Sequence, residues 1–260
     1  MRYIQKSETE PACLSEYKSG CRNLGVPEPL LYKDFNRTGE LRKILASEQH
    51  HVCCYCQRPV KAFRIEHSYP ERGLDAEKSK SLQLEYTNLF ASCIESLRLP
   101  EYLQFCDVSK GNTLIREFIK EEECVKYFRY LSTGEVVPNG NYYTLKEYEE
   151  THDLTADEKD ALQAIKVLNL NCITLRDERK KCIDALLSVL GNKSKEEWQE
   201  EIKKWLQSET FPPFIELRLQ YINKYLQSLS FVKPLHRQLS ELKEIVPEYK
   251  SKCSKYEILD

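Results

Sequence analysis

The chain has 260 residues, of which 41% are hydrophobic and 31% charged, and its formal net charge is −2. This balance is ordinary for a soluble globular protein, and 16 tyrosines with 9 phenylalanines provide apolar surface that a disordered chain lacks. No apolar run approaches the roughly 20 residues that span a bilayer, and the polar start argues against a secretory signal. We therefore expect a cytoplasmic protein without a membrane span.

The N-terminal part contains two distinct segments. Residues 1–36 carry three prolines that interrupt any long helix, so we expect an arm laid over the following domain. Residues 38–50 repeat apolar side chains at helical spacing, and Thr38 is placed to cap that helix.

The middle of the chain has weak periodicity. We expect short strands around 59–66 and a short helix after Cys106. Val, Tyr and Phe residues on either side of Thr133-Gly134 predict a β-hairpin over 124–143.

The remainder is predicted to be helical. Two capping boxes, Thr155 with Glu158 and Ser194 with Glu197, mark helix starts. The expected helices cover 155–168, 172–190, 195–207, 213–229 and 234–245.

These elements predict an α+β fold with an N-terminal arm over 1–36, a middle domain over 37–150 and a helical region over 151–260. The helical region has no cluster of catalytic residue types, so we expect it to be scaffold and the main docking surface for a partner, with the arm as a second candidate. Aromatic side chains are expected to be exposed on that surface, namely Trp198, Trp205, Tyr221 and Tyr225.

The chain has eleven cysteines, an odd number that does not favour a disulfide framework in a reducing compartment. Cys53 and Cys56 form a C-x2-C pair, and Cys93 and Cys106 follow 37 and 50 residues after Cys56. Four thiolates in two such groups predict a tetrahedral structural zinc site, with core thiols as the alternative. Cys54 lies inside the turn and is expected to point away from the metal.

Polar residues of several types lie between and after these cysteines. Glu66-His67 lies at the end of the predicted strand, where neighbouring side chains point to opposite faces unless the backbone bends. Asn88 precedes a leucine, and Asp107 and Lys110 follow the last cysteine. Taken singly, each of these is more often a solvated surface or turn residue.

Taken together, the order of these residues resembles the HNH endonuclease family. The resemblance implies a zinc-stabilised ββα-metal nuclease core that hydrolyses phosphodiester bonds in DNA or in structured RNA such as tRNA. Many members carry histidine after the last cysteine, where this chain has Asp107. A carboxylate is a hard ligand, so this departure favours Mg²⁺ over a softer metal.

A longer set of matches resembles the PtuB branch of that family, the HNH partner of an ATPase in Septu antiphage defence and in some retron systems. The resemblance is specific over 41–112 and loose beyond 190. It implies a PtuA-type ATPase as partner and, in a retron system, a reverse transcriptase with its multicopy single-stranded DNA. The matching segments are Leu41-Arg42, Leu45, Glu48-Gln49, Cys53-x-Tyr55-Cys56, Ile65-Glu66-His67, Cys106-x3-Lys110-Gly111 and Leu168-Asn169-Leu170-Asn171.

The resemblance also implies a role for each site residue. His67 is the general base, Glu66 and Asp107 hold Mg²⁺, and Asn88 orients the imidazole. Lys110 supplies a positive charge near the phosphate and is the least specific of these assignments. The four cysteines hold a zinc ion that takes no part in the chemistry, because a closed site has no open coordination position.

The charge balance leaves a second reading open. Residues 53–118 contain nine basic and nine acidic residues, so the segment is formally neutral and binds nucleic acid weakly without a partner. The alternative function is a non-catalytic zinc-binding adaptor that links an ATPase to nucleic acid. Such an adaptor needs the cysteines but has no use for Glu66, His67, Asn88 and Asp107 in register.

Overall fold

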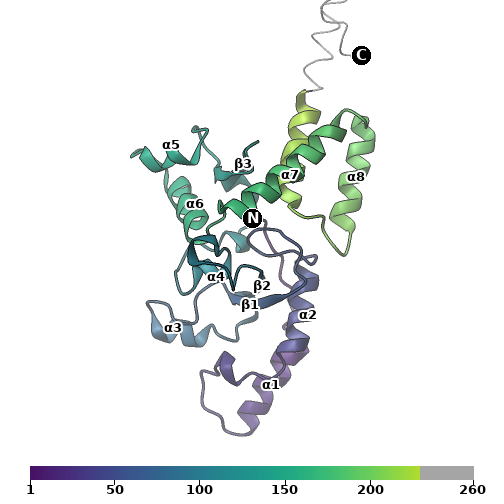
Figure 1. The fold of residues 1–260 in the computed structure, drawn as a ribbon. Helices are drawn as coiled ribbons and strands as arrows, with labels where there is room; N and C mark the ends of the chain where they lie inside the picture. The colour runs from purple at the N-terminus through teal and green to yellow at the C-terminus, as the bar shows by residue number, and fades with distance from the viewer. Residues whose placement is uncertain (229–260) are drawn as a thin grey trace, which may run out of the picture.

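A computed structural model describes residues 1–228, and Figure 1 shows how its elements are arranged. The predicted helix over 234–245 lies outside the described residues. The strands are β1 (Phe63–His67), β2 (Leu89–Cys93), β3 (Phe128–Tyr130) and β4 (Val136–Pro138). The α-helices are α1 (Ala12–Asn23), α2 (Thr38–Glu48), α3 (Ala76–Ser81), α4 (Asp107–Lys110), α5 (Leu145–Glu150), α6 (Ala156–Val167), α7 (Ile173–Leu190) and α8 (Lys195–Gln207), and residues 215–228 are also helical.

Strands β1 and β2 form a small antiparallel sheet at the centre of the N-terminal half (Figure 1). Phe63 lies opposite Cys93, and His67 lies opposite Leu89. Alternate side chains of the sheet pack on the N-terminal helices in a cluster that joins Ile65 and Leu89 to Leu41 and Leu45 of α2. The sheet therefore receives its hydrophobic cover on one side from α2 and from residues of the predicted arm, such as Leu14 and Phe35.

The N-terminal segment is more ordered than its prolines indicate. Helix α1 begins directly after Pro11 and packs against α2. The predicted cap of α2 is wrong, because Thr38 is the first helical residue and no side chain caps the helix. Arg37 instead pairs with Glu40 across the first turn, with 2.7 Å between nitrogen and oxygen.

The predicted hairpin is present as β3 and β4, paired antiparallel. Gly134 lies in its turn with φ of 82°, a conformation that glycine adopts without strain. A Cβ atom at this position would lie 2.2 Å from the carbonyl oxygen of Arg176 on α7. The turn therefore docks on α7 at a distance that only glycine allows.

Both predicted capping boxes are confirmed, at Ser194 of α8 and at Thr155 of α6. A third box, formed by Thr144 and Glu147, starts α5. Its Thr-x-x-Glu spacing was readable from the sequence, but no helix was predicted at this position.

The expectation of exposed aromatic side chains on the helical region is wrong for Trp198, which is 2% exposed. Its indole nitrogen donates to the carbonyl of Leu190 at 3.0 Å, and its ring meets Trp205 edge to face. Tyr221 and Tyr225 are partly buried against the same cluster. These rings pack between α7, α8 and the last described helix, so the exposure expected of them is absent at Trp198 and reduced at the other three.

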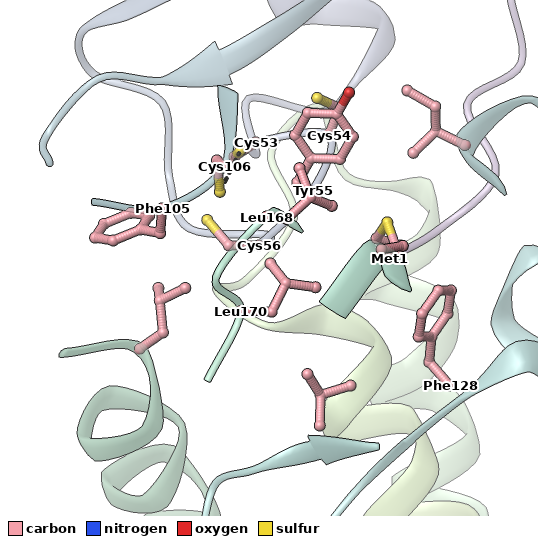
Figure 2. Close-up of a cluster of buried hydrophobic side chains, with 14 of the residues drawn as sticks. Met1, Cys53, Cys54, Tyr55, Cys56, Phe105, Cys106, Phe128, Leu168 and Leu170 are labelled. Carbon is pink, nitrogen blue, oxygen red and sulfur yellow. Dashed lines mark hydrogen bonds between the residues drawn. The ribbon is translucent and has the colours of Figure 1, made fainter. Parts of the chain in front are cut away.

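The two halves of the chain share one hydrophobic cluster. It contains all four predicted zinc ligands together with Ile165, Leu168 and Ile183 from the helical region. Figure 2 shows Leu168 and Leu170 beside Cys56 and Phe105. Among the described residues, none of the helices combines the length and apolar character needed to cross a membrane.

Candidate metal centre and carboxylate cleft

The four predicted cysteine ligands converge in the core. Their sulfur atoms all lie within 4.8 Å of one another, and each residue is buried. Cys53 Sγ is 3.8 Å from Cys106 Sγ, and Cys56 Sγ is 3.7 Å from Cys93 Sγ. Sulfur atoms around a tetrahedral zinc ion with bonds of about 2.3 Å are separated by about 3.8 Å. The cluster can therefore hold a metal ion such as zinc.

Local backbone geometry aims these sulfurs at one point. The Cys53 amide donates to the Arg58 carbonyl at 2.8 Å, which closes the C-x2-C turn, and Gln57 at its end has φ of 63°. Cys106 has φ of 59° and directly precedes α4. These left-handed residues reverse the chain where extended backbone would carry the sulfurs apart.

The Leu168-Asn169 segment fixes the far side of the centre. The Cys106 amide donates to the Leu168 carbonyl at 2.8 Å, and the Asn169 side chain donates to the Gln104 carbonyl at 2.7 Å. In the sequence this segment was one of the matches to a known family, but no role was predicted for it. Its role here is to attach the last metal ligand to the start of the helical region.

The thiols are strongly coupled. Burial alone raises a thiol pKa, yet hydrogen bonds from Cys106 and its neighbours hold the pKa of Cys53 well below its usual value. Burial and the charge at Cys53 raise the pKa of Cys106 well above its usual value. The pKa values of Cys53 and Cys106 are therefore shifted in opposite directions, and a bound divalent metal would favour the ionised form of the sulfurs that hold it.

The predicted general base and the two predicted magnesium ligands line a separate cleft of about 280 Å³ at the end of β1, whereas Asn88 and Lys110 do not line it. Glu66, His67 and Asp107 all face it, together with Glu71 and Gly111. Larger clefts lie between residues 2–8 and Phe211, and between the β3–β4 hairpin and residues 216–227, but neither contains these side chains. The smaller cleft is therefore where the chemistry-bearing residues meet.

Glu66 is buried at 3% exposure within a dense polar network. Its Oε1 accepts a hydrogen bond from the Tyr55 hydroxyl at 2.8 Å and lies 2.8 Å from the Lys110 ammonium. Burial and contact with the Asp107 carboxyl raise the Glu66 pKa well above its usual value, although Lys110 opposes that shift. A second positive charge brought to this pair of carboxyl groups favours their ionised form.

Asp107 supplies the other carboxyl group from the first turn of α4. Arg64 Nε lies 3.0 Å from its Oδ2, but the pair is not aligned as a hydrogen bond, so this buried oxygen has no hydrogen-bond partner. A buried oxygen without a donor beside a second carboxylate is the donor set that suits a hard cation. The residues present thus fit a divalent cation shared by Glu66 and Asp107.

His67 is 4% exposed and has a partner at each ring nitrogen. Nε2 lies 2.9 Å from the Gln83 carbonyl, and Nδ1 lies 3.3 Å from a Glu71 carboxylate oxygen. Because a carbonyl oxygen only accepts, Nε2 carries the proton and Nδ1 keeps its lone pair on the neutral ring. Burial lowers the His67 pKa, although Glu71 opposes the shift, so the neutral form predominates at pH 7.

Asn88 does not touch the imidazole that it was expected to orient. Its oxygen accepts from Ser68 and from the Tyr69 amide, and its nitrogen donates to the carbonyls of Tyr69 and Leu82. It acts one step away, by tying the loop after β1 to the segment whose Gln83 carbonyl receives His67.

Lys110 differs most from the expectation of a charge near a bound phosphate. It is 1% exposed, and its ammonium lies between Glu66 Oε1 and the His67 carbonyl, which it meets at 3.0 Å. It is therefore an internal counter-ion. Sequence patterns gave no signal for Arg64 and Glu71 and included Tyr55 only as part of a matching segment without a role, because the contacts of these residues join segments that are distant in the chain or lie on a loop.

No protein-family model matches the chain, and no curated protein matches it at a significant level.

Proposed function

We propose that this chain is a metal-dependent HNH endonuclease that hydrolyses phosphodiester bonds in DNA or in structured RNA such as tRNA. The observation that carries the proposal is the meeting of His67, Glu66 and Asp107 in one cleft. Their elements follow the order of a ββα-metal core, since β1 carries the first two residues and α4 follows β2 and carries the third.

His67 is suited to be the general base. Its Nε2–H is held by the Gln83 carbonyl, which leaves Nδ1 to take a proton from an attacking water. Glu71 lies beside Nδ1 and is 41% exposed, so it can move aside for that water or stabilise the imidazolium that forms.

Glu66 and Asp107 are the residues that would hold Mg²⁺. The ion would supply charge stabilisation to the phosphate and to the leaving oxygen. Around it, the chain contributes a cleft of limited volume, the Lys110 and Arg64 charges, and the Gly111 backbone at the cleft wall.

We further propose that the chain is the effector subunit of an antiphage complex with a PtuA-type ATPase and, in a retron system, a reverse transcriptase with its multicopy single-stranded DNA. The formally neutral segment over 53–118 supports this, because most non-specific affinity for nucleic acid comes from phosphate neutralisation. A partner that holds the substrate would supply the missing positive charge.

The test is a cleavage assay of the chain, with and without the ATPase, on plasmid DNA and total tRNA in the presence of Mg²⁺. We expect His67→Ala to reduce the cleavage rate by about 10²–10⁴-fold, the usual contribution of a general base. His50→Ala is the matched control, because His50 stacks on Phe211 away from the cleft. Equal cleavage by His67→Ala and the wild type would rule out the mechanism.

The adaptor reading has one observation in its favour. Lys110 and Arg64 already pair with Glu66 and Asp107, so the carboxylates are balanced without a metal. An adaptor would bind the ATPase and nucleic acid but cleave neither substrate under any of these conditions, and the same assay separates the two functions.

A further inference from the structure

We propose that Tyr55 is a positioning residue that connects the cysteine metal centre to the carboxylate cleft by fixing which oxygen of Glu66 faces a divalent cation. This inference rests on the proposed function, because it concerns the same cation site. Tyr55 lies inside the C-x2-C turn, and the other role of that turn is to position the sulfurs of Cys53 and Cys56.

Tyr55 is placed by the metal centre and reaches the cleft. It lies between Cys54 and Cys56 and is 3% exposed, so the turn that positions two metal ligands also positions its ring (Figure 2). Its hydroxyl donates to Glu66 Oε1 at 2.8 Å, across a gap of eleven residues in the sequence.

Two donors occupy the same oxygen of Glu66. Tyr55 and Lys110 both meet Oε1, and the other carboxyl group in contact with Glu66 is that of Asp107. With Oε1 held on both sides, the carboxylate plane cannot turn freely, and Oε2 remains the atom available to a cation shared with Asp107. Outer partners of this kind orient a metal-binding carboxylate, and their removal typically lowers metal affinity by 10–100-fold.

Lys110 alone would not set this geometry. Its ammonium is a point charge on a flexible stem, and it also serves the His67 carbonyl. The phenol is rigid and directional, and its position is set by the cysteine turn. The cysteine turn therefore fixes the orientation of the Glu66 carboxylate through the hydrogen bond from the Tyr55 hydroxyl.

The test measures Mn²⁺ binding to the full-length chain by electron paramagnetic resonance of the free ion, without any substrate. Tyr55→Phe removes the hydroxyl and keeps the ring that fills the core. Tyr86→Phe is the matched control, because Tyr86 is equally buried and its hydroxyl donates to a carboxylate, that of Glu48, outside the cleft. Zinc content and melting temperature are recorded for each variant.

We expect Tyr55→Phe to weaken Mn²⁺ binding about tenfold with zinc content unchanged, while Tyr86→Phe binds like the wild type and Glu66→Gln loses binding. Equal Mn²⁺ affinity in Tyr55→Phe and the wild type overturns the inference and leaves the proposed function intact. A wild-type chain that binds no Mn²⁺ at millimolar concentration overturns both. Loss of zinc from Tyr55→Phe also overturns the inference, because the tyrosine would then be needed for the cysteine turn itself.

Discussion

The cysteine centre and the carboxylate cleft lie close together and are built on opposite principles. The centre joins four residues of one kind, all buried, at separations that tetrahedral coordination requires. The cleft joins acidic and basic side chains around a histidine, and the Glu66 and Asp107 carboxylates each have a cation from the chain within 3.0 Å. The centre can hold a metal ion and, in the described part of the chain, has no cation of its own among its four sulfurs, whereas Glu66 and Asp107 in the cleft are paired with cations of the chain.

This difference shows where each region draws its stability. Four buried thiolates would repel one another, so a centre with four ionised sulfurs would depend on an ion from outside the chain. The cleft depends on pairing within the chain, and a divalent cation there has to share the carboxylates with Lys110 and Arg64. Loss of a metal ion from the cysteine centre and loss of Lys110 or Arg64 from the cleft should therefore change the stability of the fold by different amounts.

Loss of the metal from the cysteine centre should have the largest effect. Cys93→Ser should bind no zinc and should lose cooperative unfolding, because structural zinc contributes about 10–16 kcal/mol of apparent free energy in small zinc domains. The shared core makes the consequence global, since Leu168 and Ile183 pack on the same cluster. Elemental analysis for zinc and thermal melting followed by circular dichroism would measure both effects.

Cys54→Ser is the control, because Cys54 is buried next to two ligands but lies outside the set of four. It should retain about one zinc ion per chain. A well-folded Cys93→Ser chain without zinc would show that the thiols are ordinary core residues.

The two regions also differ in how far the sequence predicts them. The four metal ligands follow from the spacing of like residues, and all four converge as expected. The roles in the cleft do not follow in this way. Asn88 holds a loop in place of the imidazole, and Lys110 points inward, because a side chain's partners depend on which segments the fold brings together.

The same distinction applies to the fold. Capping boxes at Thr155 and Ser194 and the glycine turn at Gly134 are local signals, and each one is present. The exposure of Trp198 is set by how α7, α8 and the last described helix pack. No local pattern reports that arrangement, and the prediction of an exposed ring was wrong.

Removal of the internal counter-ion should have the second largest effect. If Lys110 only supplied a charge near a bound phosphate, Lys110→Ala would have a mild effect. The structure predicts a strong effect on stability, because the substitution leaves the buried Glu66 carboxylate without its charge partner. We expect Lys110→Met to lower the free energy of unfolding by about 3–5 kcal/mol, as measured by urea denaturation.

A second substitution tests the reason for that loss. Lys110→Met combined with Glu66→Gln removes both charges, and the double variant should recover much of the stability lost by the single one. Additive losses would show that Lys110 acts through packing of its hydrocarbon stem and not through the ion pair.

The Arg64 charge should have the smallest effect on stability and an effect of opposite sign on cation binding. Arg64 is 40% exposed, so its pair with Asp107 is screened by water and should contribute less than about 1 kcal/mol to folding. Arg64 nevertheless lies 3.0 Å from the oxygen of Asp107 that lacks a hydrogen bond. Arg64→Gln should therefore unfold at nearly the wild-type urea concentration while binding Mn²⁺ several-fold more tightly, because the cation no longer competes with a guanidinium.

Arg72→Gln provides the comparison, as it removes a cleft-lining charge that pairs with neither carboxylate in the described structure. If Arg64→Gln weakens Mn²⁺ binding instead, the guanidinium holds Asp107 in its binding position. The side chains of the cleft would then be positioned by cations of the chain itself, as the cysteines would be positioned by a bound metal.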